Sequence, residues 1–416
     1  MILRHLINSL RWLLPILGVA LAAAGALLAS GAWAWLLVLK GLALLAIGLV
    51  LLYGYTRSNR AEISPALKIE TWDVVNDEQH SSNTDLLHWN GAFYLVHAAA
   101  PFHFASQACR LILLRSSDAR SWSRLAEFGG SAGVENGIHD IRDPKLAVIN
   151  GRLFLYALQN VTFNPEPYTT VYTVSDDGGQ AWSPLQFLQP EGWLFWRPRS
   201  RDGVTWYAPA YWREHGKAAL FRSSDGIQWE MVSTIYDADR CDETDIEFLP
   251  DGRLLATARL EFSDSIFGHP QGCTLVAVSE PPYTRWTPAA HSPVTRLDGP
   301  ALFTWNERVY AVGRRQPDIA GPFRWQGSAF SRKRTALFLV LKEGLIHLSD
   351  LPSCSDTAYA GVAIQGGSLY ISYYTNDPAR DYPWIVGMLN PTRITLARLS
   401  LQRLETLAAH LSRPQP

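Results

Sequence analysis

Residues 243–259 read Glu-Thr-Asp-Ile-Glu-Phe-Leu-Pro-Asp-Gly-Arg-Leu-Leu-Ala-Thr-Ala-Arg, and other parts of the chain repeat the pattern of this stretch. The pattern predicts a β-hairpin, because two mostly apolar segments flank a Pro-Asp-Gly turn. Glu243 opens the first strand and Arg259 closes the second, so the hairpin brings these opposite charges side by side. Burying an unpaired charge costs several kcal/mol. We therefore expect a polar site at the open end of this hairpin.

Five further segments have the same hairpin pattern. Their turns lie at residues 91, 151, 203, 307 and 366, so that together with the turn at 252 the spacing is 49 to 60 residues. Six supersecondary units at this period predict an all-β fold, a six-bladed β-propeller, over residues 61–416. Residues 66–75 are expected to add a strand to the last blade, and residues 404–411 a short surface helix.

Residues 1–60 are expected to form a separate membrane segment. From Trp12 to Tyr53 the only charged residue is Lys40, and at about 1.5 Å per residue this run is roughly twice the length of one bilayer crossing. We predict two transmembrane helices, about 12–29 and 33–53. Lys40 then has to reach the interface or face the partner helix.

The ends of this helical pair indicate its orientation. The turn is expected at Ser30-Gly31, with Trp33 and Trp35 at one interface and Trp12 and Tyr53 at the other. Arginines flank the pair at positions 4, 11, 57 and 60. The positive-inside rule then places both ends, and the propeller, on the cytoplasmic side of what we take to be a bacterial inner membrane. A single crossing would place the propeller outside.

Composition argues against several classes of function. The 416 residues carry a net charge of −1 and no run of Lys or Arg, which argues against nucleic acid as a partner. No His-x-x-x-His or Cys-x-x-Cys spacing indicates a metal, and no Gly-rich phosphate loop indicates a nucleotide cofactor. We expect no cofactor, and we expect the four cysteines to be buried free thiols.

A second motif recurs in the later half of several units. Residues 175–182 fit Ser-x-Asp-x-Gly-x-x-Trp, and residues 116–122 and 223–229 are versions one residue shorter. The Asp accepts backbone N–H groups, the Gly allows a positive φ, and the Trp packs between blades. This motif is the Asp-box, and the chain resembles the sialidases over roughly residues 75–400. The Asp-box by itself implies the architecture of the fold and not an activity.

Polar residues gather where the inner strands of the expected propeller begin or their partner strands return. We expect these residues to form a ring at one mouth, where a glycan or glycoconjugate could bind. They are Asn83, Asp85, Asp140, Arg142, Asp143, Arg197, Arg199, Glu243, Asp245, Asp298, Tyr359, Arg259, Arg314 and Tyr374.

The sialidase resemblance implies roles for some of these residues. Glu243 and Tyr359 match the catalytic pair, in which the Glu activates the Tyr as nucleophile. Arg259 and Arg314 match arginines that bind a substrate carboxylate. Asp298, from the same ring, is a further candidate for binding the substrate. The acid/base would be an Asp. Asp85, Asp140 and Asp143 all qualify by position.

The chain departs from the sialidase pattern at the first blade. The Phe/Tyr-Arg-Ile-Pro motif is missing there, and Asn83-Thr-Asp85 occupies its place. A third substrate-binding arginine would then have to be Arg142 or Arg197. This departure leaves open whether the substrate is an acidic sugar.

Two alternatives remain from the sequence. Arg142-Asp143-Pro144 is similar to the Arg-Asp-Pro motif of the five-bladed furanosidases, which implies Asp85, Asp143 and Glu243 as the working carboxylates and Arg259 as a residue that holds Glu243. The other alternative is a non-catalytic propeller that binds a glycan or a protein at the same mouth. Both glycosidase interpretations share Glu243.

Overall fold

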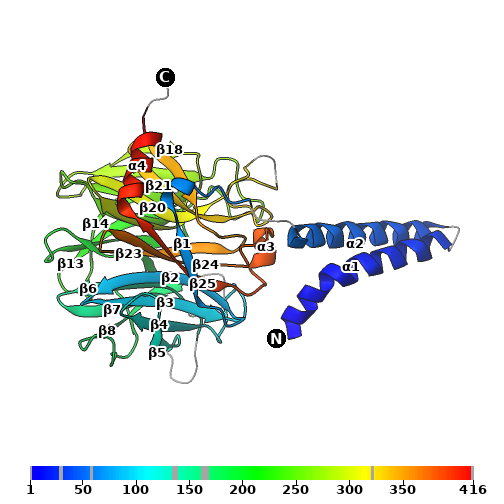
Figure 1. Ribbon diagram of the computed structural model, residues 1–416, viewed down its shortest axis with the longest axis horizontal. Helices are drawn as coiled ribbons and strands as arrows, with labels where there is room; N and C mark the ends of the chain where they lie inside the picture. Colours follow the sequence, from blue (N-terminus) through cyan, green and yellow to red (C-terminus); the bar gives the residue numbers. More distant parts are fainter. Residues whose placement is uncertain are drawn as a thin grey trace.

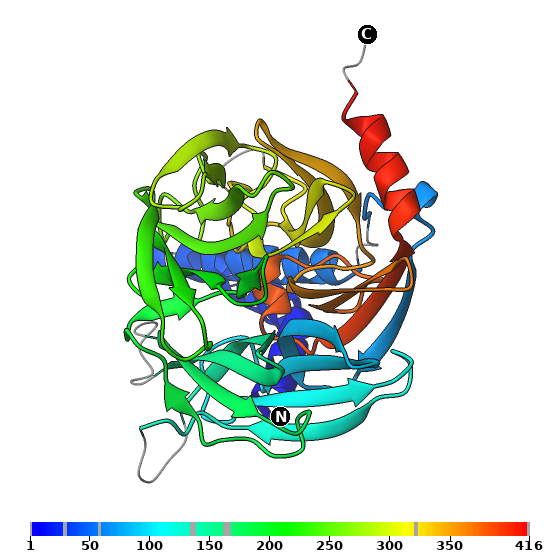
Figure 2. The same cartoon turned by 90° about the vertical axis from the view of Figure 1, so that its left-hand side faces the viewer.

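The computed structural model describes residues 2–27, 31–56, 60–133, 139–160, 168–319 and 323–413. Six antiparallel sheets stand in a ring (Figures 1 and 2), which confirms the predicted six-bladed propeller. The first three blades are β2 (His80–Trp89), β3 (Ala92–Ala100), β4 (Arg110–Ser116) and β5 (Ser123–Phe128); β6 (Ile141–Ile149), β7 (Arg152–Asn160), β8 (Tyr168–Ser175) and β9 (Gln186–Phe187); and β10 (Trp193–Phe195), β11 (Arg199–Ser200), β12 (Trp206–Trp212), β13 (Lys217–Ser223) and β14 (Glu230–Asp237). The last three are β15 (Cys241–Phe248), β16 (Leu254–Leu260), β17 (Cys273–Ser279) and β18 (Trp286–Ser292); β19 (Asp298–Trp305), β20 (Arg308–Arg315), β21 (Arg334–Leu341) and β22 (Gly344–Asp350); and β23 (Thr357–Gln365), β24 (Ser368–Thr375), β25 (Arg393–Ser400) and β1 (Glu70–Val75).

Each predicted hairpin forms the two inner strands of one blade. In the fourth blade Phe248 pairs with Leu254 next to the turn and Thr244 pairs with Ala258 near the open end. The third blade is the least regular, because β10 and β11 share β12 as their partner and leave residues 196–198 between them. The repeat therefore predicted the inner half of every blade correctly.

The two ends of the propeller chain close the ring. β1 pairs with β25 from Glu70 opposite Arg398 to Val75 opposite Ile394, so the first strand completes the last blade as expected. Helix α4 (Leu401–Leu411) follows β25 and buries Leu401, Leu404 and Ala408. The last blade therefore contains strands from both ends of the propeller chain.

The Asp-boxes are the turns between the third and fourth strands of their blades. In the second blade Asp177 accepts the backbone N–H groups of Gln180 and Ala181, each at 2.9 Å. The indole of Trp182 donates to the carbonyl of Gly179 at 2.9 Å. The same bonds recur with Asp118 and Trp122 in the first blade and with Asp225 and Trp229 in the third.

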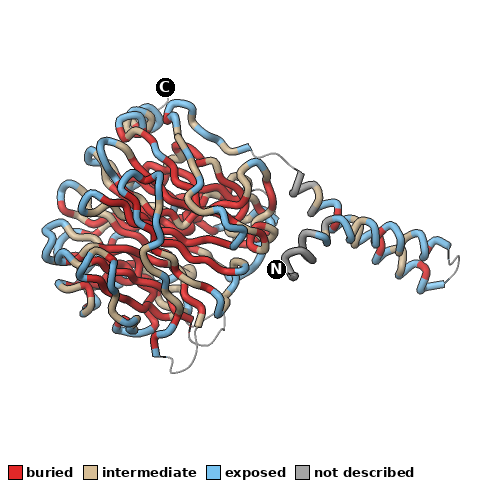
Figure 3. The backbone as a smooth tube through the Cα atoms, turned by 60° about the horizontal axis from the view of Figure 1, so that its bottom comes forward, coloured by how far each residue is buried: buried red, intermediate tan, exposed pale blue. Residues whose placement is uncertain are grey.

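Buried residues are concentrated in the strands of the propeller (Figure 3), and the buried apolar residues that the structure describes form six clusters. The four cysteines are buried and free, as expected. Burial between sheets is the physical reason for the ring, because a four-stranded blade covers its faces only by packing against its neighbours.

Five of the six inner strands carry a β-bulge at one end of the ring, which we call the mouth. The pairing slips within residues 82–85, 142–145, 241–244, 298–301 and 358–361. Asn83, Asp143 and Tyr359 take positive φ values of 49°, 51° and 46° in three of these bulges. A bulge re-aims a side chain out of the regular alternation of the strand. The predicted polar residues therefore lie at the end of the ring where the inner strands depart from regular β pairing.

Helices α1 (Ile2–Leu27) and α2 (Ala32–Thr56) pack against each other beside the propeller (Figure 1). Their backbones approach closely at small residues: a Cβ on Gly18 would lie 2.6 Å from the backbone nitrogen of Leu45, and one on Gly41 would lie 2.5 Å from that of Ala22. Small residues allow this approach between apolar helices. Lys40 is exposed and does not face the partner helix.

Among the described residues, one helix is long and apolar enough to cross a membrane, over Ala32–Val50 with a mean hydropathy of 2.1. The apolar part of α1, Trp12–Leu27, is shorter, and the helix itself begins ten residues before the predicted start at 12. Leu28–Ser30 and Arg57, and the side chains of Arg4, Arg11 and Tyr53, lie outside what the structure describes. A second crossing and the side of the membrane stay predictions.

Candidate active site

The phenol of Tyr359 donates a hydrogen bond to Oε1 of Glu243 at the mouth. The two residues lie 116 positions apart, in the bulges of β23 and β15. The other oxygen of Glu243 accepts the backbone N–H of Gly299 at 2.6 Å. Gly299 has a φ of 62°, and a Cβ there would lie 2.8 Å from Cγ of Tyr359. The glycine therefore lets the phenol ring reach Glu243.

Glu243 is 3% exposed and Tyr359 is partly buried. Burial raises the pKa of Glu243 to about 7; Asp242 and Asp298 add to the rise, and Arg259 opposes it. Burial and the nearby Glu243 raise the pKa of Tyr359 well above its ordinary value. Near neutral pH the pair therefore consists of a neutral phenol and a carboxyl group poised to gain or lose a proton.

Arg259 is held by carboxylates of its own blade. Its Nε lies 2.7 Å from Oδ1 of Asp242, and its Nη2 contacts the other oxygen of the same carboxylate. Its Nη1 lies 3.1 Å from Oε2 of Glu243. The predicted contact between Glu243 and Arg259 is present, and Asp242 makes the bidentate pair.

Asp298 stands among three guanidinium groups. Its Oδ1 accepts from Nε of Arg296 at 2.8 Å and lies 3.6 Å from Nη1 of Arg259, and its Oδ2 lies 3.4 Å from Nη1 of Arg314. Burial opposes ionisation, but the three arginines outweigh it and lower the pKa of Asp298. Arg259 and Arg314 therefore share an internal carboxylate with Arg296.

Arg314 is 2% exposed, and the last blade supplies most of its partners. Its Nε donates to the carbonyl of Thr357 at 2.8 Å, and its Nη2 donates to the phenol of Tyr374 at 2.9 Å. Its Nη2 also lies 3.4 Å from Asp356, and the ring of Tyr359 lies 5.3 Å from the guanidinium carbon. Arg314 thus ties β20 to the strand that carries Tyr359.

The remaining predicted arginines serve other pairs. Arg197 is 5% exposed and donates to Asp85 at 3.0 Å and to the carbonyl of Pro300 at 2.8 Å. Arg142 forms a bidentate pair with Asp140, at 2.6 and 2.8 Å. The guanidinium that joins Arg259 and Arg314 is neither of these but Arg296, from the loop before β19.

The three candidate acid/base carboxylates differ in their partners. Asp85 is engaged by Arg197 and by the backbone N–H of Leu146 at 2.7 Å, and Asp140 is engaged by Arg142. Asp143 is partly buried, and its Oδ1 is a buried oxygen with no hydrogen-bond partner. Its charge acts on Tyr359, whose pKa it helps to raise. Asp143 is therefore the one of the three candidates whose carboxylate has an oxygen without a hydrogen-bond partner.

Sequence reasoning missed several residues of this network. Asp356 lies three residues before Tyr359 and accepts from His103 at 2.7 Å and from the indole of Trp384 at 2.8 Å. Nε2 of His80 lies 3.1 Å from Oδ2 of Asp356, the oxygen that also contacts His103. Trp384 begins the short helix α3 (Trp384–Gly387), and no sequence pattern singled it out. Buried polar residues that flank a predicted site residue, such as Asp242 beside Glu243 and Arg296 beside Asp298, were the available signal.

Among the residues that the structure describes, two groups of His and carboxylate side chains bring possible ligand atoms within 4.8 Å of one another: His80, His103 and Asp356, and His215, Asp242 and Glu261. In both groups an arginine already contacts a carboxylate, Arg314 at Asp356 and Arg259 at Asp242. The positive charge that a metal would supply is thus provided by guanidinium groups. The expectation of no metal stays a prediction.

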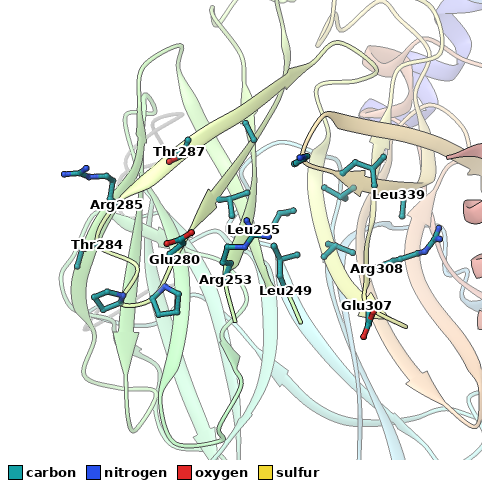
Figure 4. A pocket seen from close by; sticks show the side chains of 18 of the residues that line it. Leu249, Arg253, Leu255, Glu280, Thr284, Arg285, Thr287, Glu307, Arg308 and Leu339 are labelled. Atoms are coloured by element: carbon teal, nitrogen blue, oxygen red, sulfur yellow. The ribbon is translucent and has the colours of Figure 1, made fainter. Parts of the chain in front are cut away.

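A groove of about 810 Å³ lies at the opposite end of the ring, between the fourth and fifth blades (Figure 4). Leu249, Leu255 and Leu339 line it, with Glu280 and Arg308 at its margins. These charged residues belong to strand ends and turns away from the mouth, and none of the predicted site residues lines the groove. We therefore place the candidate site at the mouth.

Comparison with known proteins agrees with this geometry at the level of the fold. No family model matches the chain, and no curated protein matches it. Among solved structures, Trypanosoma rangeli sialidase in complex with sialic acid superposes with a TM-score of 0.57 at 12% identity, covering 84% of this chain and 61% of the sialidase. The chain has the fold of the sialidases. It spans 61% of the length of that enzyme.

Two further structures share the sialidase fold. The NanB sialidase from Streptococcus pneumoniae has a TM-score of 0.54 at 10% identity, with 83% of this chain and 71% of that chain covered. The GH93 α-L-arabinofuranosidase of Fusarium graminearum, in complex with arabinobiose, has the same TM-score at 11% identity, with 83% of this chain and 98% of that chain covered. Chains described as acting on different sugars therefore share this architecture.

Proposed function

We propose that this chain is a membrane-anchored glycoside hydrolase in which Tyr359 is the nucleophile and Glu243 is its base. The observation that carries the proposal is the hydrogen bond from the Tyr359 phenol to a buried Glu243 whose other oxygen is held by Gly299. A phenol becomes a nucleophile when an adjacent base takes its proton. Tyrosine nucleophiles are a recognised exception among glycosidases that otherwise use two carboxylates.

In the first step Oη of Tyr359 attacks the anomeric carbon, and Glu243 Oε1 takes the phenol proton. The bond to the leaving oxygen breaks as Asp143 donates a proton to that oxygen. In the second step Asp143 takes a proton from water, the water oxygen attacks the same carbon, and the phenol leaves and regains its proton from Glu243. Two displacements at one carbon return the original anomeric configuration.

Asp143 is the preferred acid/base because its Oδ1 has no partner, whereas Asp85 and Asp140 are each bound by an arginine. The furanosidase-like interpretation, which needs Asp85 as a working carboxylate, is disfavoured for the same reason. Its other elements, Asp143 and Glu243, belong to the mechanism proposed above.

The sugar unit that is cleaved carries no carboxylate, in our proposal. Asp298 already fills the space among Arg259, Arg296 and Arg314, and Asp242, Glu243 and Asp356 contact the same arginines. A substrate carboxylate gains little from guanidinium groups that are already paired. The arginine cluster is therefore a support for Glu243 and Tyr359 and not a cradle for an anion.

A panel of aryl glycosides, containing neutral pyranosides, neutral furanosides and a sialoside, tests the proposal with the full-length protein in detergent. We expect hydrolysis of a neutral member with retention of configuration by NMR, and a loss of about 10²-fold or more in kcat for Tyr359→Phe. Tyr370→Phe, a change in the same sheet away from Glu243, is the matched control and should keep full activity. Preference for the sialoside would overturn the neutral substrate, and binding without hydrolysis of any member would favour the binding module.

Membrane anchoring is supported by the length and apolar composition of α2. We propose that α1 crosses as well, because its backbone packs closely against α2 along small residues. Both ends of the pair then lie on one side of the membrane, with the propeller, which the positive-inside rule puts in the cytoplasm. In sealed right-side-out vesicles, protection of the propeller from added protease would support that side, and cleavage of the propeller would contradict it.

A further inference from the structure

The chain that leaves α2 is fastened to the mouth side of the propeller. The backbone N–H of Glu62 donates to Asp350 at 2.8 Å, and the Glu62 side chain accepts from Arg315 at 2.9 Å. Arg315 ends β20 and Asp350 ends β22, and both of these strands run toward the mouth. Thr56 is the last residue of α2. Six residues reach about 20 Å at most, so the mouth rim is tethered close to the end of α2.

The orientation of the whole molecule agrees with this tether. Helix α3 lies at the mouth, because its Trp384 contacts Asp356 and packs 4.7 Å from the guanidinium carbon of Arg314. In Figure 1, α3 is on the side of the propeller that faces α1 and α2, and in Figure 2 these helices lie behind the ring. If α2 crosses a bilayer, the mouth therefore faces that bilayer.

Exposed apolar side chains gather on the mouth loops. The loop between β16 and β17 carries Phe267, and the loop between β20 and β21 carries Phe323 and Phe330; their ring centroids lie 5.5 to 5.7 Å apart. We call these three rings the aromatic cluster. Phe323 is 59% exposed, and the flanking Ile266 and Ile319 are 58% and 49% exposed.

The aromatic cluster is built into the mouth. The N–H of Ala329 donates to the carbonyl of Ile266 at 2.8 Å, which joins the two loops. The N–H of Ile385, in α3, donates to the carbonyl of Ala329 at 2.8 Å, which joins these loops to the helix beside Asp356. An exposed patch of packed aromatic rings is costly in water and is typical of a surface that contacts another apolar phase. Arg324 and Asp264 are exposed on the same loops and carry opposite charges.

We propose that the mouth face rests on the bilayer, with the aromatic cluster in the headgroup region, and that the site takes a glycan carried on a membrane lipid. The proposed contact with the bilayer depends only on the tether at Glu62 and on the aromatic cluster. The lipid-borne substrate rests in addition on the proposed glycosidase function. Aromatic side chains favour the interface between headgroups and acyl chains, which is where such a glycan is attached.

Site-specific quenching tests the contact without reference to activity. Phe323→Cys and Arg324→Cys at the mouth, and Val204→Cys as the control, are labelled with an environment-sensitive fluorophore in the full-length chain. Val204 is 66% exposed in the turn between β11 and β12, at the other end of the ring, and the native cysteines are buried. In nanodiscs that contain lipid with a quencher near the headgroup, we expect quenching at 323 and 324 and none at 204. Equal quenching at all three positions, or none at 323 and 324, would overturn the proposal.

A pair of substrates tests the lipid carrier. The neutral aryl glycoside that the panel identifies is compared with the same sugar attached to a dialkylglycerol in the nanodisc. For Phe267→Ser/Phe323→Ser we expect kcat/KM to fall about tenfold for the lipid-borne sugar, because two apolar contacts are lost, and to stay unchanged for the soluble glycoside. An equal effect on both substrates would overturn the lipid carrier. Absence of hydrolysis in the panel would count against the glycosidase and leave the quenching result standing.

Discussion

The mouth of the propeller and its opposite end are made by the same six hairpins, but they differ in how regular the strands are and in the charges that they bury. At the opposite end the strands join through tight turns such as Asn150-Gly151, where a Cβ on the glycine would meet nothing within 4 Å. At the mouth the strands carry bulges, and Glu243, Asp298 and Arg314 are only 3%, 3% and 2% exposed. A turn needs little beyond a permitted backbone conformation, whereas buried charges need partners of opposite charge, from their own blade or from another. The mouth is therefore the end of the ring at which charged groups are buried for chemistry, at a cost in stability.

The largest expected difference between the two ends comes from Glu243→Gln. Gln cannot take the phenol proton, so we expect kcat to fall by about 10³-fold or more while the fold is kept. Glu307→Gln, in the turn of the fifth hairpin at the opposite end, is the control and should leave kcat unchanged. Steady-state kinetics on the aryl glycoside from the panel measure both. An active Glu243→Gln enzyme would remove the role assigned to this residue.

The next effect is that of Asp143→Asn, which removes the proposed acid/base. We expect kcat to fall by about 10²-fold for a glycoside with a poor leaving group. For a leaving group that needs no protonation the first step should be nearly normal, and azide should restore turnover by replacing the activated water. The same loss for good and poor leaving groups would point to a structural role for Asp143 and reopen Asp85 and Asp140.

A matched pair of glycines sharpens the comparison further. Gly299→Ala forces a Cβ against the ring of Tyr359, and a displacement of the phenol by about 1 Å should lower kcat by about 10²-fold at most. Gly151→Ala, at a φ of 75° in an open turn, should leave kcat unchanged. It should lower the free energy of unfolding by about 1 kcal/mol, measured by urea unfolding with tryptophan fluorescence. Equal effects of the two changes on kcat would contradict the difference between the ends.

The smallest effect is the pH dependence that Glu243 imposes. As a base it works ionised, and burial raises its pKa to about 7. We expect kcat/KM to fall about tenfold for each unit by which the pH drops below about 7, on the acid side of the profile. A plateau that extends down to pH 5 would show that Glu243 ionises there and is not the base that limits the rate.

The same shift has a consequence for stability. The pKa of Glu243 rises from a reference value of 4.5 to about 7 on folding, so the folded state holds the proton more tightly. The stabilisation from this proton is complete below the unfolded pKa and is lost as pH rises through the folded pKa. The difference in unfolding free energy between the wild type and Glu243→Gln should change over that window and be constant outside it.

The sequence alone determined the repeating parts of the protein. Hairpin spacing and turn residues predicted six blades, and the Asp-boxes predicted three of their outer turns, because these features depend on residues close together in the chain. Glu243 also followed from local pattern, as a charge at the start of an apolar strand. The contact of Glu243 with Tyr359 came from resemblance to the sialidases, since no local pattern joins residues 116 positions apart.

Only the tertiary structure decided how the charges of the mouth are shared. The sequence offered Arg142 and Arg197 as a third guanidinium, but these residues bind Asp140 and Asp85, and Arg296 takes the position beside Asp298. It also could not separate Asp143 from Asp85 and Asp140. The physical reason is that a buried charge is stabilised by whichever opposite charge lies nearest in space, and that partner can belong to the same blade, as Asp140 does for Arg142, or to another blade, as Asp85 does for Arg197. The side of the propeller that faces α2 was decided in the same way, by Glu62 binding Asp350 across 288 residues.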